Sequence, residues 1–82
     1  MTRQQFTDAV RQYAALALRQ RRSYAPQVEV LVKAYMGDVS KLPVGGEREA
    51  ATDHVENVLT REYAPNDAAF KLPDLDALAI PF

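Results

Sequence analysis

Residues 28–42, VEVLVKAYMGDVSKL, carry the strongest helical pattern in this chain of 82 residues. Their large apolar side chains recur at steps of three and four residues, which places them on one face of a helix. They are Val28, Leu31, Val32, Tyr35, Met36, Val39 and Leu42. The β-branched run at the start also suits a strand, but a lone strand would have no partner, so a helix is predicted. We expect the rest of the chain to pack against this apolar stripe.

The N-terminal segment predicts another helix. Thr2 and Gln5 have the spacing of a capping box, in which each residue bonds the backbone of the other. The apolar positions that follow again share one face; they are Phe6, Ala9, Val10, Tyr13, Ala14 and Ala17. Leu18 lies off this face, so a monomer would expose it. Its position indicates a second contact surface.

Pro26 leaves two arrangements of these helices open. A proline inside a helix loses a hydrogen bond and clashes with the preceding turn, at a cost of ~3 kcal/mol. This favours a turn at residues 23–25, with Pro26 in the first turn of the next helix. However, no Gly or Asn caps the first helix. Apolar residues also recur every eleven positions (Phe6, Ala17, Val28), close to three helical turns, which suits one long helix with a kink.

The segment after Val44-Gly45-Gly46, which predicts a hinge, completes the helical part. Glu47 and Glu49 would lie in the first turn of a third helix, where the helix dipole favours acids. A narrow apolar stripe follows, formed by Ala51, Val55, Val58 and Leu59. The predicted fold is all-α: a small three-helix body over residues 1–64, with helices near 3–23, 26–41 and 47–63, and an extended apolar C-terminal tail over residues 65–82.

The tail is the strongest candidate for a binding element. Its large side chains are Phe70, Leu72, Leu75, Leu78, Ile80 and Phe82, although Pro73 and Pro81 prevent a long helix. A segment this apolar is not expected to remain in water. It must pack on the chain's own helices or on a partner, and the sequence leaves both open. We expect these six residues to contact a protein partner, together with Leu18 and the basic cluster of Arg19, Arg21 and Arg22.

Charge is distributed unevenly along the chain. Residues 1–25 contain five arginines and one aspartate, a net charge of +4. Residues 46–82 contain eight acids and three basic residues, a net charge of −5. The interpretation that we favour is attraction between these parts within one fold, and the alternative is head-to-tail association between copies.

No residue pattern predicts catalysis, a cofactor or a metal site. A helical metal site at His54 would need a second ligand four residues later, where the chain has Val58. His54 is therefore predicted to lie at the surface or the edge of the core. The four tyrosines are predicted to lie at core edges with their hydroxyls in water. The basic cluster is short and the whole chain slightly acidic, which argues against nucleic-acid binding.

The bulk properties set the remaining expectations. A chain of this length forms one domain with a thin core, and the sequence has no cysteine for a disulfide. No apolar run approaches the ~18 residues of a membrane span. The polar N-terminus does not resemble a signal peptide. These features predict a cytoplasmic protein.

In size, lack of motifs and apolar C-terminus, the chain is similar in type to the small accessory proteins of bacteriophages. The resemblance implies a non-enzymatic structural or assembly subunit of a larger complex, such as a phage virion, that self-associates or joins other proteins through its tail. The alternative is a small inhibitor or regulator that binds one host protein. A third hypothesis is a nucleic-acid-binding protein that uses Arg19–Arg22.

Overall fold

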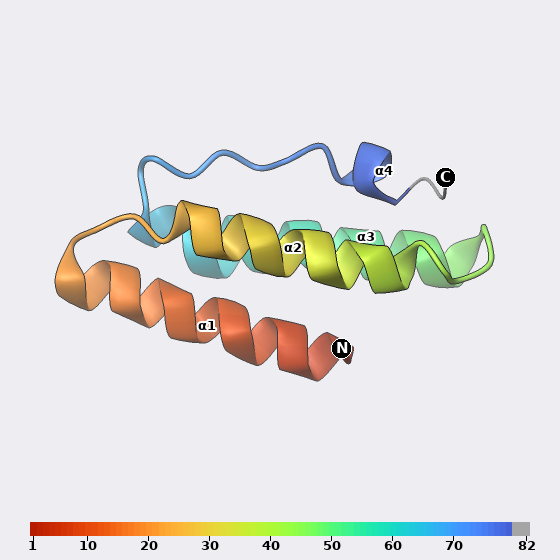
Figure 1. Ribbon diagram of the computed structural model, residues 1–82, viewed down its shortest axis with the longest axis horizontal. Coiled ribbons are helices and arrows are strands. Elements are labelled where there is room, and N and C mark those ends of the chain that lie inside the picture. The colour runs from red at the N-terminus through yellow and green to blue at the C-terminus, as the bar shows by residue number, and fades with distance from the viewer. Residues whose placement is uncertain (80–82) are drawn as a thin grey trace.

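In the computed structural model, which describes residues 1–79, helix α1 spans Arg3–Gln20 (Figure 1). It begins with the predicted capping box. The Thr2 hydroxyl accepts a hydrogen bond from the Gln5 N–H at 3.1 Å, and the Gln5 side chain accepts one from the Thr2 N–H at 2.8 Å. The helix ends at Arg21, which has the left-handed conformation with φ of 50°. Glycine usually takes this position because it has no Cβ.

The turn after α1 decides between the two arrangements that Pro26 left open. Helix α2 spans Ala25–Val39, with Pro26 in its first turn, where the missing N–H costs no helical hydrogen bond. The single kinked helix is therefore wrong, and two helices joined by residues 21–24 are observed. The first helix is three residues shorter than predicted, because Arg21 leaves the helical conformation without a glycine.

Helix α3 spans Gly46–Val58 and follows Gly45, whose φ of 144° suits glycine alone. It continues as a π-helical turn, η1, over Leu59–Tyr63 and a 3₁₀ turn, η2, over Ala64–Asn66. In the π-helical turn, the Ala64 N–H donates a hydrogen bond to the carbonyl of Leu59, five residues earlier. Pro65 lies in this 3₁₀ turn and has no N–H to donate to a further helical hydrogen bond. Where the sequence predicts one helix over residues 47–63, the structure has an α-helix to Val58 that continues as π-helical and 3₁₀ turns.

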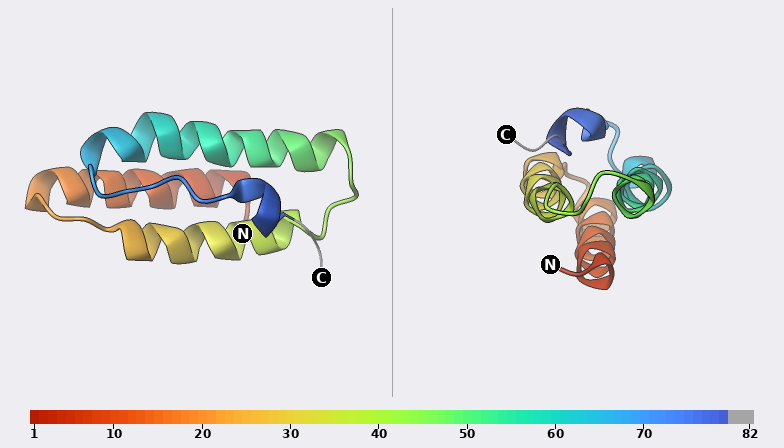
Figure 2. Two further views of the ribbon diagram at one scale, coloured as in Figure 1. Left: turned by 90° about the horizontal axis from the view of Figure 1, so that it is seen from above. Right: turned by 90° about the vertical axis from the view of Figure 1, so that its right-hand side faces the viewer.

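The three long helices pack side by side around one apolar core (Figure 2). Phe6 of α1 stacks on Tyr35 of α2 with ring centroids 4.8 Å apart. The fully buried side chains come from all three helices and η1; the largest are Tyr63, Phe6, Met36, Leu59, Val10, Val28, Val32 and Val55. Residues 1–79 contain helices and no strands, so the predicted all-α class is confirmed.

The C-terminal tail turns back after η2 and runs along α2 and α3 (Figures 1 and 2). Its single helical turn, α4 (Leu75–Leu78), is capped by Asp74, whose carboxylate accepts the Ala77 N–H at 3.2 Å. Leu75 and Ala79 are buried against the other helices. Within residues 1–79, no helix is both long enough and apolar enough to cross a membrane.

Candidate functional site

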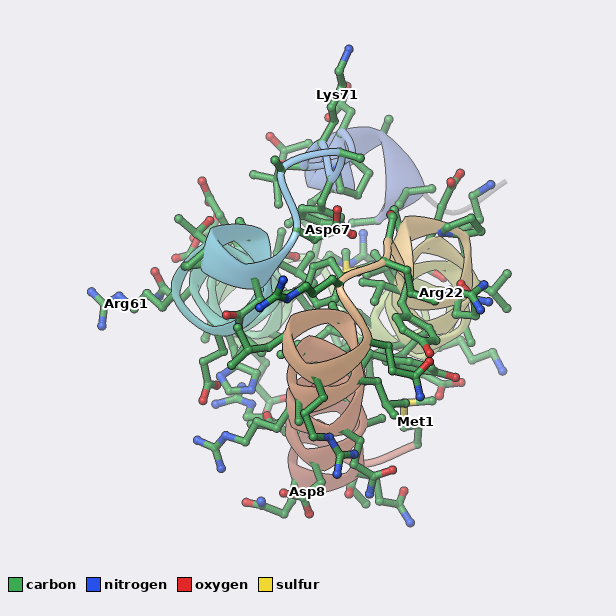
Figure 3. All side chains as sticks on the ribbon, turned by 90° about the vertical axis from the view of Figure 1, so that its left-hand side faces the viewer. Met1, Asp8, Arg22, Arg61, Asp67 and Lys71 are labelled. Atoms are coloured by element: carbon green, nitrogen blue, oxygen red, sulfur yellow. The ribbon has the colours of Figure 1, made fainter. Side chains whose placement is uncertain are left out.

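A buried polar junction joins the α1–α2 turn, the end of α3 and the start of the tail. Asp67 is only 7% exposed, and its Oδ2 atom accepts hydrogen bonds from the Tyr63 hydroxyl at 2.6 Å and the Ser23 hydroxyl at 2.7 Å. Its Oδ1 atom accepts the Ala69 N–H at 3.0 Å. The Tyr63 hydroxyl in turn accepts the Tyr24 N–H at 3.0 Å. In the view along the bundle, Asp67 lies centrally, between the helices and the tail (Figure 3).

The electrostatics of this junction favour a charged aspartate beside a neutral tyrosine. Burial raises the pKa of Asp67, but the hydrogen bonds from Tyr63, Ser23 and the Ala69 backbone outweigh burial and hold this pKa below its usual range. Burial, and then the hydrogen bond to Asp67, raise the pKa of Tyr63 from 10.0 to about 12. The prediction that tyrosine hydroxyls reach water is therefore wrong for Tyr63, because an acid four residues later gives its hydroxyl a buried partner. The i, i+4 spacing of Tyr63 and Asp67 is the sequence signal that could have revealed it.

His54 has a structural partner instead of a ligand. Its Nε2 atom lies 2.8 Å from the Thr7 hydroxyl, which donates its own proton to the carbonyl of Arg3 at 2.9 Å. Because that hydroxyl has one proton, Nε2 must be the donor to Thr7. Burial, and then the positive charge of Arg3, lower the pKa of His54 below 6.5. Residues 1–79 hold no group of three His, Cys, Asp or Glu side chains that could bind a metal ion.

The predicted tail residues are not equally available to a partner. Phe70 packs edge-on against the ring of Tyr63 with centroids 4.9 Å apart, and Leu75 and Leu78 pack against the core. Leu72 is 44% exposed. Ile80 and Phe82 lie outside the described residues. In this structure the tail therefore covers the chain's own helices. Among its described residues, Leu72 is the large apolar side chain that remains exposed.

The other predicted site residues come together at one end of the bundle, which we call the basic end: Leu18, Arg19, Arg21 and Arg22. Leu18 is 64% exposed, as its position off the apolar stripe predicts. The three arginines are exposed, and none lies within 4.0 Å of a carboxylate in residues 1–79. The guanidinium of Arg22 lies 5.1 Å from the centre of the Tyr24 ring.

The opposite end of the bundle has a feature that the sequence did not predict. An open cavity of about 430 Å³ lies between the start of α3 and α4, and its wall includes Val44, Glu49, Asp53 and Asp76. We call these four residues the acidic end. Val44 is 85% exposed. The spacing of Glu49 and Asp53, four residues apart on α3, is visible in the sequence, but the return of the tail that brings Asp76 beside them is not.

Arg48 also lines the cavity of the acidic end, where its positive charge is held by hydrogen bonds to uncharged backbone carbonyls. One terminal nitrogen of Arg48 donates to the carbonyls of Ser40 and Leu42 at 2.7 Å and 2.6 Å. In the described part of the chain, no basic group lies within 4.0 Å of the carboxylates of Glu49, Asp53 and Asp76. Between residues 1–25 and 46–79, the structure forms one ion pair, Arg11 with Glu62 at 2.6 Å. Direct ion pairing between these two parts of residues 1–79 is therefore limited to this one pair.

Comparison of the chain with known protein families, curated proteins and solved structures gives no match.

Proposed function

We propose that this protein is a non-enzymatic subunit of a larger protein assembly and that it contacts its partners through the two ends of the bundle. The observation that carries the proposal is the separation of unpaired charge between the basic end and the acidic end. Among residues 1–79, both ends expose a large apolar side chain, Leu18 at 64% and Val44 at 85%. Apolar groups beside charged side chains are typical of surfaces that recognise a complementary protein.

The arrangement of the tail supports the same proposal with one change from the sequence-based hypothesis. Phe70 and Leu75 close the chain's own core, so they are not the primary anchors for a neighbour. The tail instead contributes Asp76 to the acidic end, and Leu72 to the exposed surface. The class of assembly that we favour is a bacteriophage particle, on the resemblance in type given above.

Solution mass tests this function. Light scattering of the full chain over a concentration range, at low and at high salt, should show a mass that rises with concentration and falls with salt, because exposed charges are screened within about 10 Å at 0.1 M salt. A mass that stays monomeric at every concentration would contradict a self-assembling subunit.

A pair of matched variants makes this measurement specific to the ends. Leu18→Ser should weaken the association because it removes the apolar group of the basic end. Val30→Ser should leave association unchanged, because Val30 is similarly exposed, at 69%, but lies on α2 outside both ends. Equal effects of the two substitutions would argue against the ends as the contact surfaces.

A regulator that binds one target protein is the second candidate. The observation in its favour is the buried tail, which gives the single chain a closed core without a second copy. A monomer that binds its target at a fixed ratio of one to one would support this candidate. The mass measurement above separates the two functions, because an assembly subunit adds in many copies.

A further inference from the structure

We propose that the partner of the basic end is the acidic end of a second copy of this chain, so that copies associate head to tail. This inference rests on the proposed function and names the partner and the contact. In it, Arg19 and Arg21 of one copy face the cavity between α3 and α4 of the next copy. Glu49, Asp53 and Asp76 line that cavity and supply the opposite charge.

Two surfaces of the same molecule are complementary in charge. The arginines of the basic end have no carboxylate within 4.0 Å, and the acids of the acidic end have no cation within 4.0 Å, in residues 1–79. With Arg48, the wall of the cavity at the acidic end carries a net charge of −2, against +3 on the three arginines of the basic end. Complementary potentials steer two such surfaces together and set their register.

The two ends also differ in the size of their cavities. The cavity at the acidic end has a volume of about 430 Å³ and is open to solvent, whereas the cavity beside Arg21, Arg22 and Asp67 at the basic end is smaller, at about 210 Å³. Arg21 follows the last residue of α1 in the left-handed conformation, and its side chain is exposed.

The two surfaces lie far apart on the molecule. The α1–α2 turn and the α2–α3 loop lie at opposite ends of the long axis, which extends 39 Å against 21 and 17 Å for the other two (Figures 1 and 2). A pair of copies in end-to-end contact along this axis uses one basic end and one acidic end and leaves the other two ends free. Contacts between unlike surfaces generate open chains, or rings where the rotation closes.

The test uses two variants of the full chain in sedimentation velocity at low salt. The first, Arg19→Glu with Arg21→Glu, reverses the basic end and leaves the acidic end intact. The second, Asp53→Asn with Asp76→Asn, neutralises the acidic end and leaves the basic end intact. None of these four side chains forms a hydrogen bond or an ion pair in the described structure, so circular dichroism should show wild-type helix content.

We expect the association constant of each variant alone to be lower than that of the wild type by about tenfold or more. An equal mixture of the two variants has one matched pair of ends, so it should form a heterodimer that does not grow. A control, Arg3→Glu with Lys71→Glu, makes the same change in net charge as the first variant but at exposed residues outside both ends. It should associate as the wild type does.

Three results would overturn the proposal. Wild-type association that neither variant weakens would refute the head-to-tail contact and leave the assembly function standing on another surface. A mixture without heterodimer would refute the pairing of these two ends. A wild-type chain that stays monomeric, including one whose arginines bind a DNA duplex at low salt instead, would refute both this contact and the self-assembling function.

Discussion

Replacing Tyr63 with phenylalanine tests the buried junction that fastens the tail to the helices. The substitution keeps the aromatic ring, which is 0% exposed and packs on Phe70, and removes only the hydroxyl. That hydroxyl donates to Asp67 Oδ2 at 2.6 Å and accepts the Tyr24 N–H at 3.0 Å. Its loss therefore leaves a buried carboxylate with one donor fewer and a backbone N–H without its acceptor.

The expected cost follows from these two contacts. A hydrogen bond to a charged group contributes ~1.5–3 kcal/mol, and a buried donor left without a partner costs ~1–3 kcal/mol. Because partial access of water reduces the sum, we expect Tyr63→Phe to lower the free energy of unfolding by about 2–4 kcal/mol. At about 0.05–0.15 kcal/mol per residue, this chain has a total stability of only about 4–12 kcal/mol. The melting temperature should fall by roughly 10–25 °C.

Urea titration followed by circular dichroism measures this cost, and Tyr13→Phe is the matched control. Tyr13 is partly buried, but its hydroxyl forms no hydrogen bond in the described structure, so the control should change stability by less than ~0.5 kcal/mol. If Tyr63→Phe lowers the free energy of unfolding by less than ~0.5 kcal/mol, the hydroxyl of Tyr63 contributes no net stability to the protein.

Three further predictions use the same unfolding assay or a titration. Leu75→Ala should lower the free energy of unfolding by about 2–4 kcal/mol because Leu75 is buried, whereas Leu72→Ala should lower it by less than ~0.5 kcal/mol. Equal losses for the two variants would place the tail away from the core. Arg21→Gly should stabilise the chain by ~0.5–1 kcal/mol by relieving the left-handed conformation, and a loss of stability would contradict that conformation. The chemical shifts of the His54 ring protons, followed by NMR against pH, should give a pKa below 6.5. A pKa above 6.5 would contradict the burial of His54 beside Thr7 and Arg3. Since the folded-state pKa of His54 is lowered, its contribution to stability is present above pH 6.5 and lost as the pH falls.

The helices could be predicted because their signals are local. The period of the apolar residues in 28–42 predicts a buried face, and Val28, Val32 and Met36 are all fully buried. The capping box at Thr2 and Gln5 marks the start of α1 within one turn. These patterns depend only on neighbours three or four residues apart, which a sequence displays directly.

The candidate surfaces depend on contacts between distant residues and were predicted only in part. The basic end is contiguous in sequence, so Leu18 and its arginines could be identified as a group. The acidic end forms only because the tail turns back and places Asp76 beside α3. No local sequence pattern predicts the direction in which the tail runs. The Ser23–Asp67 bond likewise joins residues 44 positions apart.

The junction at Asp67 also orders the folding of the chain in time. The bonds from Ser23 and Tyr24 to the Asp67–Tyr63 pair span 44 and 39 residues, so they form only after most of the chain has left the ribosome. Helices α1 and α2 can gain backbone hydrogen bonds earlier because those contacts are local. The apolar surface that Leu75 covers stays exposed to water until the tail has been synthesised. A chain without its tail therefore presents this surface to chaperones and to other chains.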